Sequence, residues 1–195
     1  MDSLSMEKIN DLYVIFQRRL TRRWKIYVKK YNCENIVELG VYKGRNFQKM
    51  IEYPPKLAVA VDAWIDDGVL ARNDMALTQA QKSIQYERFK MEVADKPFVK
   101  ICRGYTFDVV KEFPDNFFDL IYHDADHTEE GFLRDMEDWW PKMRSGAAVT
   151  GDDYRDDLTG TGVRYGVINA LKTFSKKYNV EIFPMPRLGW ATIKP

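Results

Sequence analysis

The sequence has few of the residues that stabilise secreted or metal-clustered domains. Its 195 residues include two cysteines, Cys33 and Cys102, and two histidines. Two cysteines are too few for a disulfide framework, and their spacing matches no metal-ligand motif. Each lies beside or inside an apolar run, where a free thiol usually behaves as a small buried hydrophobe. This cysteine usage favours a reducing, intracellular compartment.

A large net charge and a long apolar run are also missing. The 30 basic side chains nearly balance the 29 acidic ones, so the formal net charge is +1. No global field therefore attracts nucleic acid or an anionic membrane. No apolar stretch approaches the ~20 residues that a spanning helix needs, and the first ten residues lack the hydrophobic region of a signal peptide. We expect a cytoplasmic protein that binds neither nucleic acid nor membrane.

The N-terminal residues have the periodicity of an amphipathic helix. Apolar side chains recur there at three- and four-residue steps, at Leu12, Ile15, Phe16, Leu20, Trp24 and Val28. Eight basic side chains against three acidic ones make the first 30 residues strongly basic. We expect residues 1–34 to form a basic helical cap and residues 35–195 to form the main domain. The basic face is either a solvated face of a packed helix, a cover for the active site, or a docking surface for an acidic partner.

After the cap, short apolar runs alternate with helical patterns. The runs predict strands at residues 35–39, 57–61, 99–102, 118–122, 147–150, 180–183 and 190–193. The helical patterns lie at residues 46–51, 79–93, 105–112, 128–143 and 163–178. Such alternation is typical of an α/β fold with a mainly parallel sheet and helices on both faces. The last two strands have no helix between them, which predicts an antiparallel hairpin at one edge of a seven-stranded, Rossmann-like sheet.

Ligands of such sheets bind at the carboxyl ends of the strands, so the residues that follow each strand are the candidates for a site. The first strand runs into Glu38, Gly40 and Gly44, with no third glycine to complete a dinucleotide-binding motif. An acid at this position repels a pyrophosphate and attracts a cationic sulfonium and ammonium. This contrast favours S-adenosylmethionine over NAD as the cofactor. The second strand ends at Asp62, whose carboxylate can accept hydrogen bonds from ribose hydroxyls.

Two segments carry a resemblance to a known family. Glu-Leu-Gly-Val-Tyr-Lys-Gly at 38–44 and Val-Asp-Ala-Trp at 61–64 resemble the first two motifs of class I S-adenosylmethionine-dependent methyltransferases. The likeness covers about residues 35–193 and is closest to the branch of macrolide-sugar O-methyltransferases and cephalosporin-hydroxylase-like proteins. It implies that Gly40 lies against the methionine part of the cofactor and that Asp62 holds the ribose.

The same resemblance places further residues around the cofactor. It implies that Trp64 and the turn formed by Gly104, Tyr105 and Thr106 lie around the adenine, with core packing as the alternative for Trp64. We also expect Glu38, Gly44 and Asp124 to contribute to cofactor binding.

Acidic residues gather where the fourth and fifth strands end. Asp124 and Asp126 follow the fourth strand, and Asp152 and Asp153 follow the fifth. Burying like charges together is costly, and a hard cation such as Mg²⁺ or Ca²⁺ relieves the repulsion. The pattern resembles the metal site of sugar and catechol O-methyltransferases, which implies Asp124, Asp152 and Asp153 as ligands of Mg²⁺. The sequence has Asp where the catechol enzymes have Asn. A set of solvated loop acids without a metal is the alternative.

The two histidines have different predicted roles. Asp124 and His127 are the candidate catalytic residues, with His127 as general base because an imidazole titrates near neutrality. Neighbouring acids raise its pKa, however, so a role in orienting Asp124 or opening the next helix is an equal alternative. His123 should point to the opposite face of its strand and pack.

Two loops should lie beside the acceptor. Residues 65–94 are longer than a crossover needs, and Trp64, Met75, Tyr86 and Phe89 could line an acceptor pocket or pack against the helix. Residues 152–162 form the second loop. The predicted function is methyl transfer to a small hydroxylated acceptor. The sequence leaves a monomer and a homo-oligomer as alternatives.

Three other functions compete with this prediction. A nicotinamide-dependent oxidoreductase is weakened by Glu38 and the missing glycine. A ferrous oxygenase would need two histidines and a carboxylate around one metal, and His123 and His127 are poorly placed for that. The third alternative is a Rossmann-like binding module without catalysis.

Overall fold

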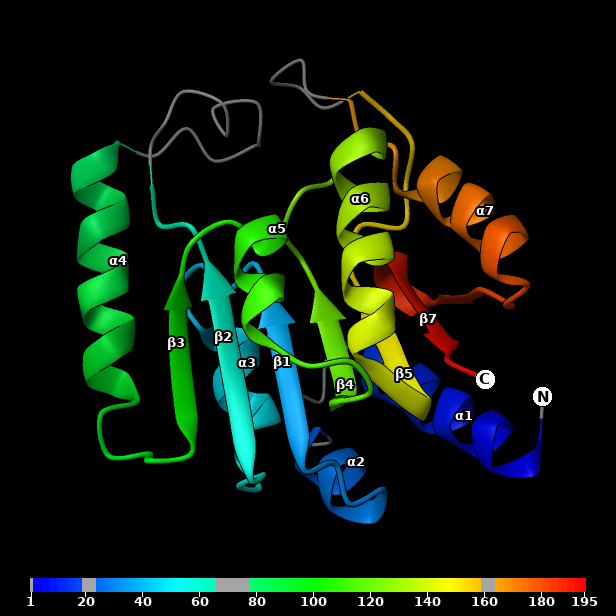
Figure 1. Cartoon of the computed structure of the whole chain (residues 1–195), viewed down its shortest axis with the longest axis horizontal. Coiled ribbons are helices and arrows are strands. Elements are labelled where there is room, and N and C mark those ends of the chain that lie inside the picture. The colour runs from blue at the N-terminus through cyan, green and yellow to red at the C-terminus, as the bar shows by residue number, and fades with distance from the viewer. Residues whose placement is uncertain (1, 19–23, 66–77, 159–163) are drawn as a thin grey trace.

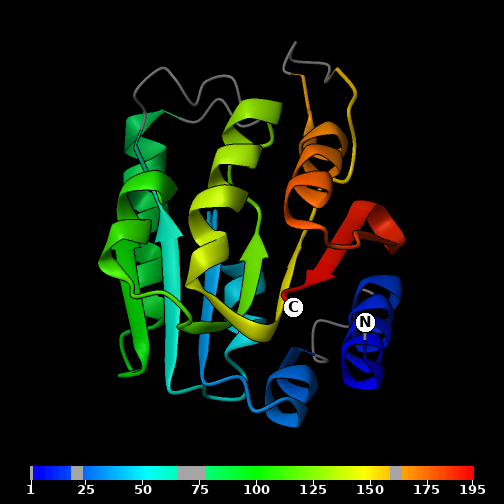
Figure 2. The same ribbon diagram turned by 45° about the vertical axis from the view of Figure 1, so that its right-hand side comes forward.

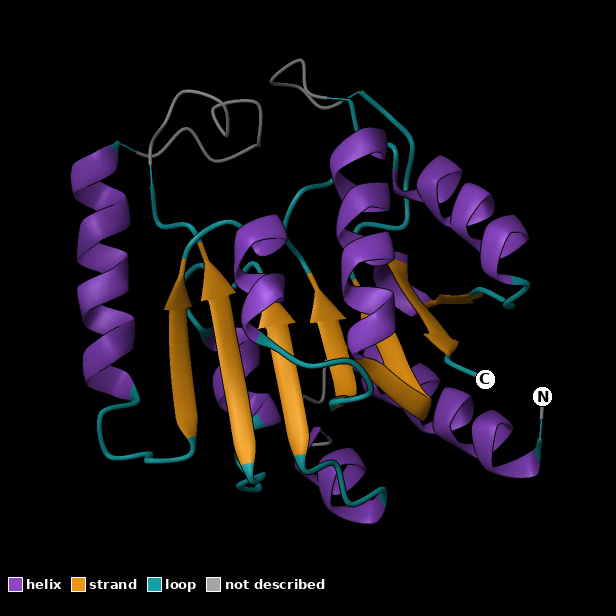
Figure 3. Ribbon diagram, viewed as in Figure 1, coloured by secondary structure: helices purple, strands orange, loops and turns teal. Residues whose placement is uncertain are grey.

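A computed structural model describes residues 2–18, 24–65, 78–158 and 164–195 of the chain (Figure 1). Its centre is one sheet of seven strands in the order β3-β2-β1-β4-β5-β7-β6. The strands are β1 (Asn35–Leu39), β2 (Leu57–Asp62), β3 (Val99–Arg103), β4 (Phe118–His123), β5 (Met143–Gly151), β6 (Phe183–Met185) and β7 (Gly189–Ile193). Strands β1 to β5 are parallel, whereas β7 runs antiparallel to β5 and to β6 (Figure 3). The predicted α/β fold and its antiparallel C-terminal hairpin are confirmed.

Helices cover both faces of the sheet (Figure 2). One face packs against α1 (Ser3–Arg18), α2 (Trp24–Lys30), α3 (Arg45–Met50) and α4 (Gln79–Glu92). The other packs against α5 (Thr106–Val109), η3 (Val110–Glu112), α6 (Glu129–Trp139), η4 (Trp140–Lys142) and α7 (Val167–Tyr178). Side chains of a strand alternate between these two cores, so residues two apart on β1 or β4 share a face. Among the described helices, none has the length and apolar character to cross a bilayer.

The N-terminal segment is two helices that share a core with the sheet. The apolar side chains that predicted a helix are buried, including Leu12, Phe16 and Trp24. Helix α1 lies against β6, β7 and the short η5 (Pro186–Leu188), and α2 lies against α3. Leu20 falls outside the described residues. The segment is therefore packed onto the domain. This packing agrees with the interpretation of its basic residues as the solvated face of a packed helix.

The sixth strand begins three residues later than predicted. Val180 is buried and apolar, which suggested a strand start, but its backbone bonds to the end of α7. Its N–H donates to the carbonyl oxygen of Ser175, and its carbonyl oxygen accepts from the Ser175 hydroxyl at 2.6 Å. Both backbone groups of Val180 are thus engaged with the helix end, and its N–H is not available to a strand partner. Ladder pairing therefore starts only at Phe183.

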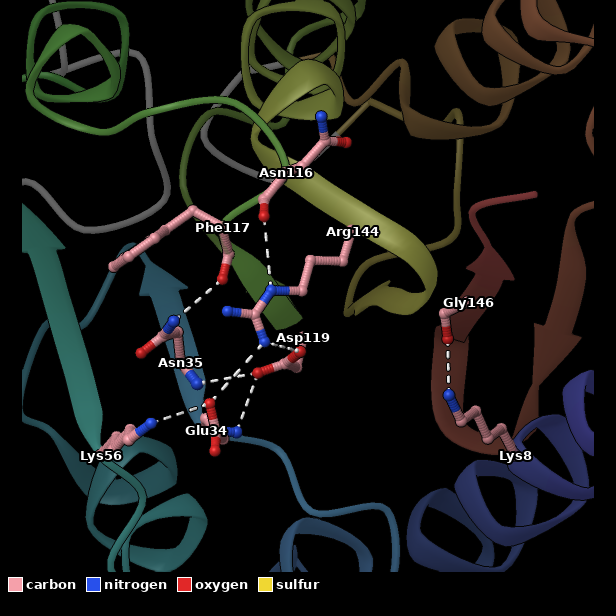
Figure 4. A network of polar contacts seen from close by, with 9 residues as sticks. All are labelled: Lys8, Glu34, Asn35, Lys56, Asn116, Phe117, Asp119, Arg144 and Gly146. Atoms are coloured by element: carbon pink, nitrogen blue, oxygen red, sulfur yellow. Dashed lines mark hydrogen bonds and ion pairs between the residues drawn. The ribbon is translucent and has the colours of Figure 1, made fainter.

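A polar network fixes the amino ends of β1, β4 and β5 (Figure 4). Asp119 accepts the backbone N–H groups of Glu34 and Asn35 at 2.8 and 2.9 Å, and its other oxygen accepts from Arg144 at 2.9 Å. The Asn35 amide donates to the carbonyl oxygen of Phe117 at 3.0 Å. These contacts join three neighbouring strands at their amino ends, opposite to the carboxyl ends. They therefore help to fix the register of the three strands, and so the relative positions of the carboxyl ends.

Candidate active site

The carboxyl ends of β1, β4 and β5 lie level with one another. Leu39 pairs with His123, and His123 pairs with Gly151. The residues that follow these three, Gly40, Asp124 and Asp152, therefore leave the sheet side by side. Strand order reverses between β1 and β4, because β2 and β3 lie on one side of β1 and the later strands on the other. This reversal is where open α/β sheets bind ligands.

Gly40 allows the ends of β1 and β4 to approach closely. Its φ is +84°, and a Cβ at this position would lie 1.9 Å from the carbonyl oxygen of Asp124. The Asp124 N–H donates to the Leu39 carbonyl oxygen at 2.8 Å, and the Gly40 N–H donates to that of Val61 at 2.8 Å. The glycine was predicted to contact a cofactor. The structure assigns it a further role, since no larger residue fits between the two strand ends.

Gly44 is placed by a different contact. It precedes α3 with a φ of +72°, and a Cβ there would lie 2.3 Å from the Phe89 ring. The tight turn was expected from the sequence, but the packing of α4 against it was not, because nothing in the local pattern indicates a partner 45 positions away.

Glu38 is a buried carboxylate at the centre of the site. Its side chain is 2% exposed, and among the described residues its Oε2 has no hydrogen-bond partner. Burial raises the pKa of Glu38 well above its usual range, and the charge of Asp124 raises it further. A hydrogen bond from the Asn46 side chain acts in the opposite direction, by favouring the charged form. Burying an acid oxygen without a hydrogen-bond partner costs free energy. Because a cationic ligand would supply the missing partner, Glu38 is suited to bind one.

Asp62 joins the loops after β1 and β2. One of its oxygens accepts the Tyr42 N–H at 2.7 Å, and the other accepts the Trp64 N–H at 2.8 Å. Burial raises the pKa of Asp62, and these backbone hydrogen bonds oppose the rise. Each carboxylate oxygen has a second lone pair. The predicted role with the ribose therefore remains compatible with this structural one.

Residues predicted around the adenine are largely engaged with the protein. Trp64 is 2% exposed, its Nε1 donates to the Tyr42 carbonyl oxygen at 2.9 Å, and its ring stacks on Phe89. This placement favours the packing alternative for Trp64. The Thr106 hydroxyl donates to Asp135 at 2.6 Å, so this side chain is also engaged with the protein.

The rest of the predicted turn lies at the sheet edge, where the Gly104 N–H donates to the Asp62 carbonyl oxygen at 3.0 Å. The Tyr105 ring stacks on Phe107. Of the other pocket candidates, Tyr86 packs on Trp64, and Met75 lies outside the described residues.

Three side chains from the ends of β4 and β5 converge like ligands of a metal ion. Candidate ligand atoms of Asp124, His127 and Asp153 lie within 4.8 Å of one another. The His127 Nε2 lies 3.3 Å from an Asp124 oxygen and 3.4 Å from an Asp153 oxygen. Burial lowers the pKa of His127, but Asp124, Asp153 and Asp126 together outweigh it, and the net shift is upward. The upward shift of the pKa favours the protonated imidazole, which opposes the predicted role of general base.

Asp152 was predicted as a metal ligand but lies outside this group. Its carboxylate accepts the Tyr122 hydroxyl at 2.9 Å, and His127 takes its place beside Asp124 and Asp153. Burial, and then the charge of Asp124, raise the pKa of Asp152 to about 6. The hydrogen bond from Tyr122 opposes that rise. The sequence did not point to Tyr122, because a tyrosine at the end of an apolar strand looks like an ordinary core residue.

The two histidines have different neighbours. The Tyr165 ring stacks on the His127 ring at 5.1 Å, and the Arg155 guanidinium lies 4.1 Å from the centre of the Tyr165 ring. His123 is buried on the other face, 3.5 Å from an Asp135 oxygen, as strand alternation predicted. Arg155 belongs to the predicted acceptor loop of residues 152–162, whereas Tyr165 lies three residues beyond it. Residues 159–163 of that region are outside the described part of the chain.

Comparisons with known proteins point to one family. A family model described as "Methyltransferase domain" matches residues 37–154. No curated protein matches the sequence. The structure of the O-methyltransferase NovP is 17% identical, with a TM-score of 0.63 over 92% of this chain and 80% of that one. An O-methyltransferase from Bacillus cereus in complex with SAH is 14% identical, with a TM-score of 0.60 over 100% and 92% of the two chains. Spermidine synthase from Thermotoga maritima is 16% identical, with a TM-score of 0.52 over 84% and 54%. At these identities the solved structures establish the fold alone.

The close approach at Gly40 predicts a specific destabilisation. Gly40→Ala should lower the free energy of unfolding by at least about 3 kcal/mol, because it adds a collision to an unfavourable φ. Gly146 has a φ of +76°, but the nearest atom to its Cβ would be 3.9 Å away, so it carries the conformational cost alone. Gly146→Ala should therefore cost only about 1–2 kcal/mol. Urea denaturation of both variants measures the difference, and equal losses would contradict the steric argument.

The raised pKa of Asp152 predicts a pH dependence. The folded state keeps the Asp152 proton up to about pH 6, whereas the unfolded chain releases it near 3.8. Stability therefore falls as pH rises through this window. Asp152→Asn removes this loss and keeps an acceptor for Tyr122, so it should stabilise the ligand-free protein at neutral pH by on the order of 1–2 kcal/mol. Urea denaturation from about pH 4 to about pH 7 tests this, and parallel pH profiles for the two proteins would contradict it.

Proposed function

Because the chain belongs to the methyltransferase-domain family of class I S-adenosylmethionine-dependent enzymes, we propose that it transfers the methyl group of this cofactor to a hydroxyl oxygen of a small acceptor, with the assistance of a divalent cation. The observation that carries the proposal is the buried Glu38 carboxylate with an unpartnered oxygen, at the point where strand order reverses. S-adenosylmethionine carries a sulfonium and an ammonium group, both cationic. A poorly solvated acid is a favourable partner for such charges.

The surrounding residues fit this cofactor better than a dinucleotide. The charged forms of Glu38, Asp62 and Asp124 would repel a pyrophosphate, whereas a cationic ligand would favour those charged forms. Gly40 and Gly44 are engaged in close packing and are not followed by the third glycine of a dinucleotide motif. These features disfavour the nicotinamide-dependent alternative. The candidate site also keeps its full set of acids, which disfavours the alternative of a binding module that has lost catalysis.

The donor set also fits a divalent transition-metal ion such as Mn²⁺ better than the expected Mg²⁺, because it includes an imidazole nitrogen. Asp124 and Asp153 offer carboxylate oxygens and His127 offers an imidazole nitrogen, a combination common for divalent metals. A bound ion would supply Lewis acidity that lowers the pKa of an acceptor hydroxyl. His127 Nε2 would have to release its proton to serve as a ligand, and it cannot act as a base through the same atom. We therefore assign His127 to metal binding in preference to proton abstraction.

Methylation at oxygen is supported by two of the structural neighbours. Both NovP and the Bacillus cereus protein are described as O-methyltransferases. Their structures align with 92% and 100% of this chain, respectively. The protein residues would contribute mainly positioning, by holding the donor at Glu38 and Asp62 and the acceptor beside Asp124. Fixing two reactants in this way replaces an unfavourable bimolecular encounter.

Calorimetric titration with S-adenosylmethionine, S-adenosylhomocysteine and NAD tests the proposal. The first two should bind and NAD should not. Glu38→Gln should weaken S-adenosylmethionine binding about tenfold or more, because an isosteric amide lacks the charge that faces the cations. Glu112→Gln is the matched control, since Glu112 is exposed and paired with Lys100 at the surface. Binding of NAD alone, or equal affinities of the two variants, would overturn the proposal.

Titration with Mn²⁺ tests the metal assignment separately. Asp153→Asn should weaken Mn²⁺ binding at least about tenfold, whereas Asp126→Asn should have little effect, because Asp126 caps the backbone N–H of Thr128. Affinity should increase as pH rises through the raised pKa of His127, since the ion displaces its proton. If the two variants lost the same affinity, the acids would attract ions only by diffuse charge, and the metal site would be rejected.

A further inference from the structure

One residue of the N-terminal segment contacts both sides of the site. Trp24 opens α2, outside the residues that the family model matches, and is 2% exposed. Its indole Nε1 donates to the Asn46 Oδ1 at 3.0 Å, and its ring meets the Tyr122 ring edge-on at 5.7 Å. Asn46 lies next to Glu38, and Tyr122 bonds to Asp152. Trp24 is therefore one side chain away from two acids, the buried Glu38 and the half-buried Asp152.

The contact with Asn46 fixes which way its amide group faces. An indole N–H can only donate, so Asn46 must present its oxygen to Trp24. The amide nitrogen then faces the other way, 3.4 Å from the Met50 sulfur and toward Glu38, to which the side chain makes a hydrogen bond. Without the indole donor, the amide is free to turn its oxygen toward the carboxylate. That orientation would repel the charged form of Glu38.

The contact with Tyr122 acts on the second acid. Glu38 and Tyr122 are register partners on β1 and β4, and both point to the face on which α1 and α2 pack. Phe16 stacks on Tyr122 at 6.4 Å with 12° between the rings, so two aromatic side chains of the N-terminal segment hold the phenol. The phenol hydroxyl donates to Asp152 at 2.9 Å.

We propose that Trp24 is a positioning residue of the cofactor site, which orients Glu38 through Asn46 and supports Asp152 through Tyr122. The helical segment before β1 is then a working part of the site, in addition to its packing role. The inference rests on the proposed function for its ligand, S-adenosylmethionine, but its geometric basis lies in the protein alone.

The test compares two tryptophan-to-phenylalanine variants. Trp24→Phe keeps a ring against Tyr122 and removes the N–H to Asn46. Trp139→Phe is the matched control, because Trp139 is equally buried on the other face and its Nε1 has no hydrogen-bond partner among the described residues. Calorimetry should show the Kd for S-adenosylmethionine raised about five- to tenfold by Trp24→Phe and changed less than about twofold by Trp139→Phe.

Asn46→Ala supplies a second test and covers the case in which Trp24→Phe fails to fold. It should raise the Kd by a similar factor, and the double variant should be no weaker than either single one, because both changes break the same relay. An unchanged Kd in Trp24→Phe or in Asn46→Ala, an equal rise in Trp139→Phe, or additive effects would each overturn the proposal.

A measurement without ligand separates this proposal from the proposed function. If the wild-type protein does not bind S-adenosylmethionine, the proposed function fails. Orientation of Asn46 is then read from the hydrogen exchange of its side-chain amide by NMR in the free protein. Trp24→Phe should accelerate that exchange and Trp139→Phe should not. Unchanged exchange in Trp24→Phe would reject the relay.

Discussion

Mutual repulsion among carboxylates at one poorly solvated edge of the sheet is the constraint on which the site depends. Glu38, Asp62, Asp124 and Asp152 influence one another there, and burial raises the pKa of three of them. The fold offsets each charge with a different neighbour. Backbone N–H groups bind Asp62, a phenol binds Asp152, an imidazole lies beside Asp124, and an amide lies beside Glu38. The offset is least complete at Glu38, where one oxygen remains without a partner among the described residues.

An arrangement of this kind trades stability for binding. A protein selected only for stability would bury apolar groups at these positions, because unpaired buried charge is costly. Keeping the acids is worthwhile where a cationic ligand or a metal ion compensates them. The two halves of the site differ in this respect. Acids on the β1 and β2 side face the position expected for a cofactor, and those on the β4 and β5 side converge with His127 in the geometry of a metal ligand set.

The sequence predicted the framework well because apolar runs and strand ends are local signals. It placed β1 at its observed bounds and located the acids that follow β1, β2, β4 and β5. It could not predict which acid turns inward, because that choice depends on side chains far away in the sequence. Asp152 accepts a hydrogen bond from Tyr122, and His127 converges with Asp124 and Asp153. Trp64 carried a motif-based role, yet its indole fits between loops and α4. The contribution of Trp24 was hidden for the same reason, since an aromatic residue at helical spacing indicates only burial.

The contact between Gly40 and the Asp124 carbonyl has a consequence for how new specificities could arise on this scaffold. The ends of β1 and β4 lie so close together that no side chain fits at Gly40. This part of the site therefore cannot be reshaped by substitution to bind a different ligand. Differences in ligand shape must then be accommodated by side chains around the strand ends. Among the described residues, Tyr165 stacks on His127 there, and Arg155 lies against the Tyr165 ring. A change of ligand specificity is therefore expected at positions such as Arg155 and Tyr165, with the strand ends and the acids that follow them left unchanged.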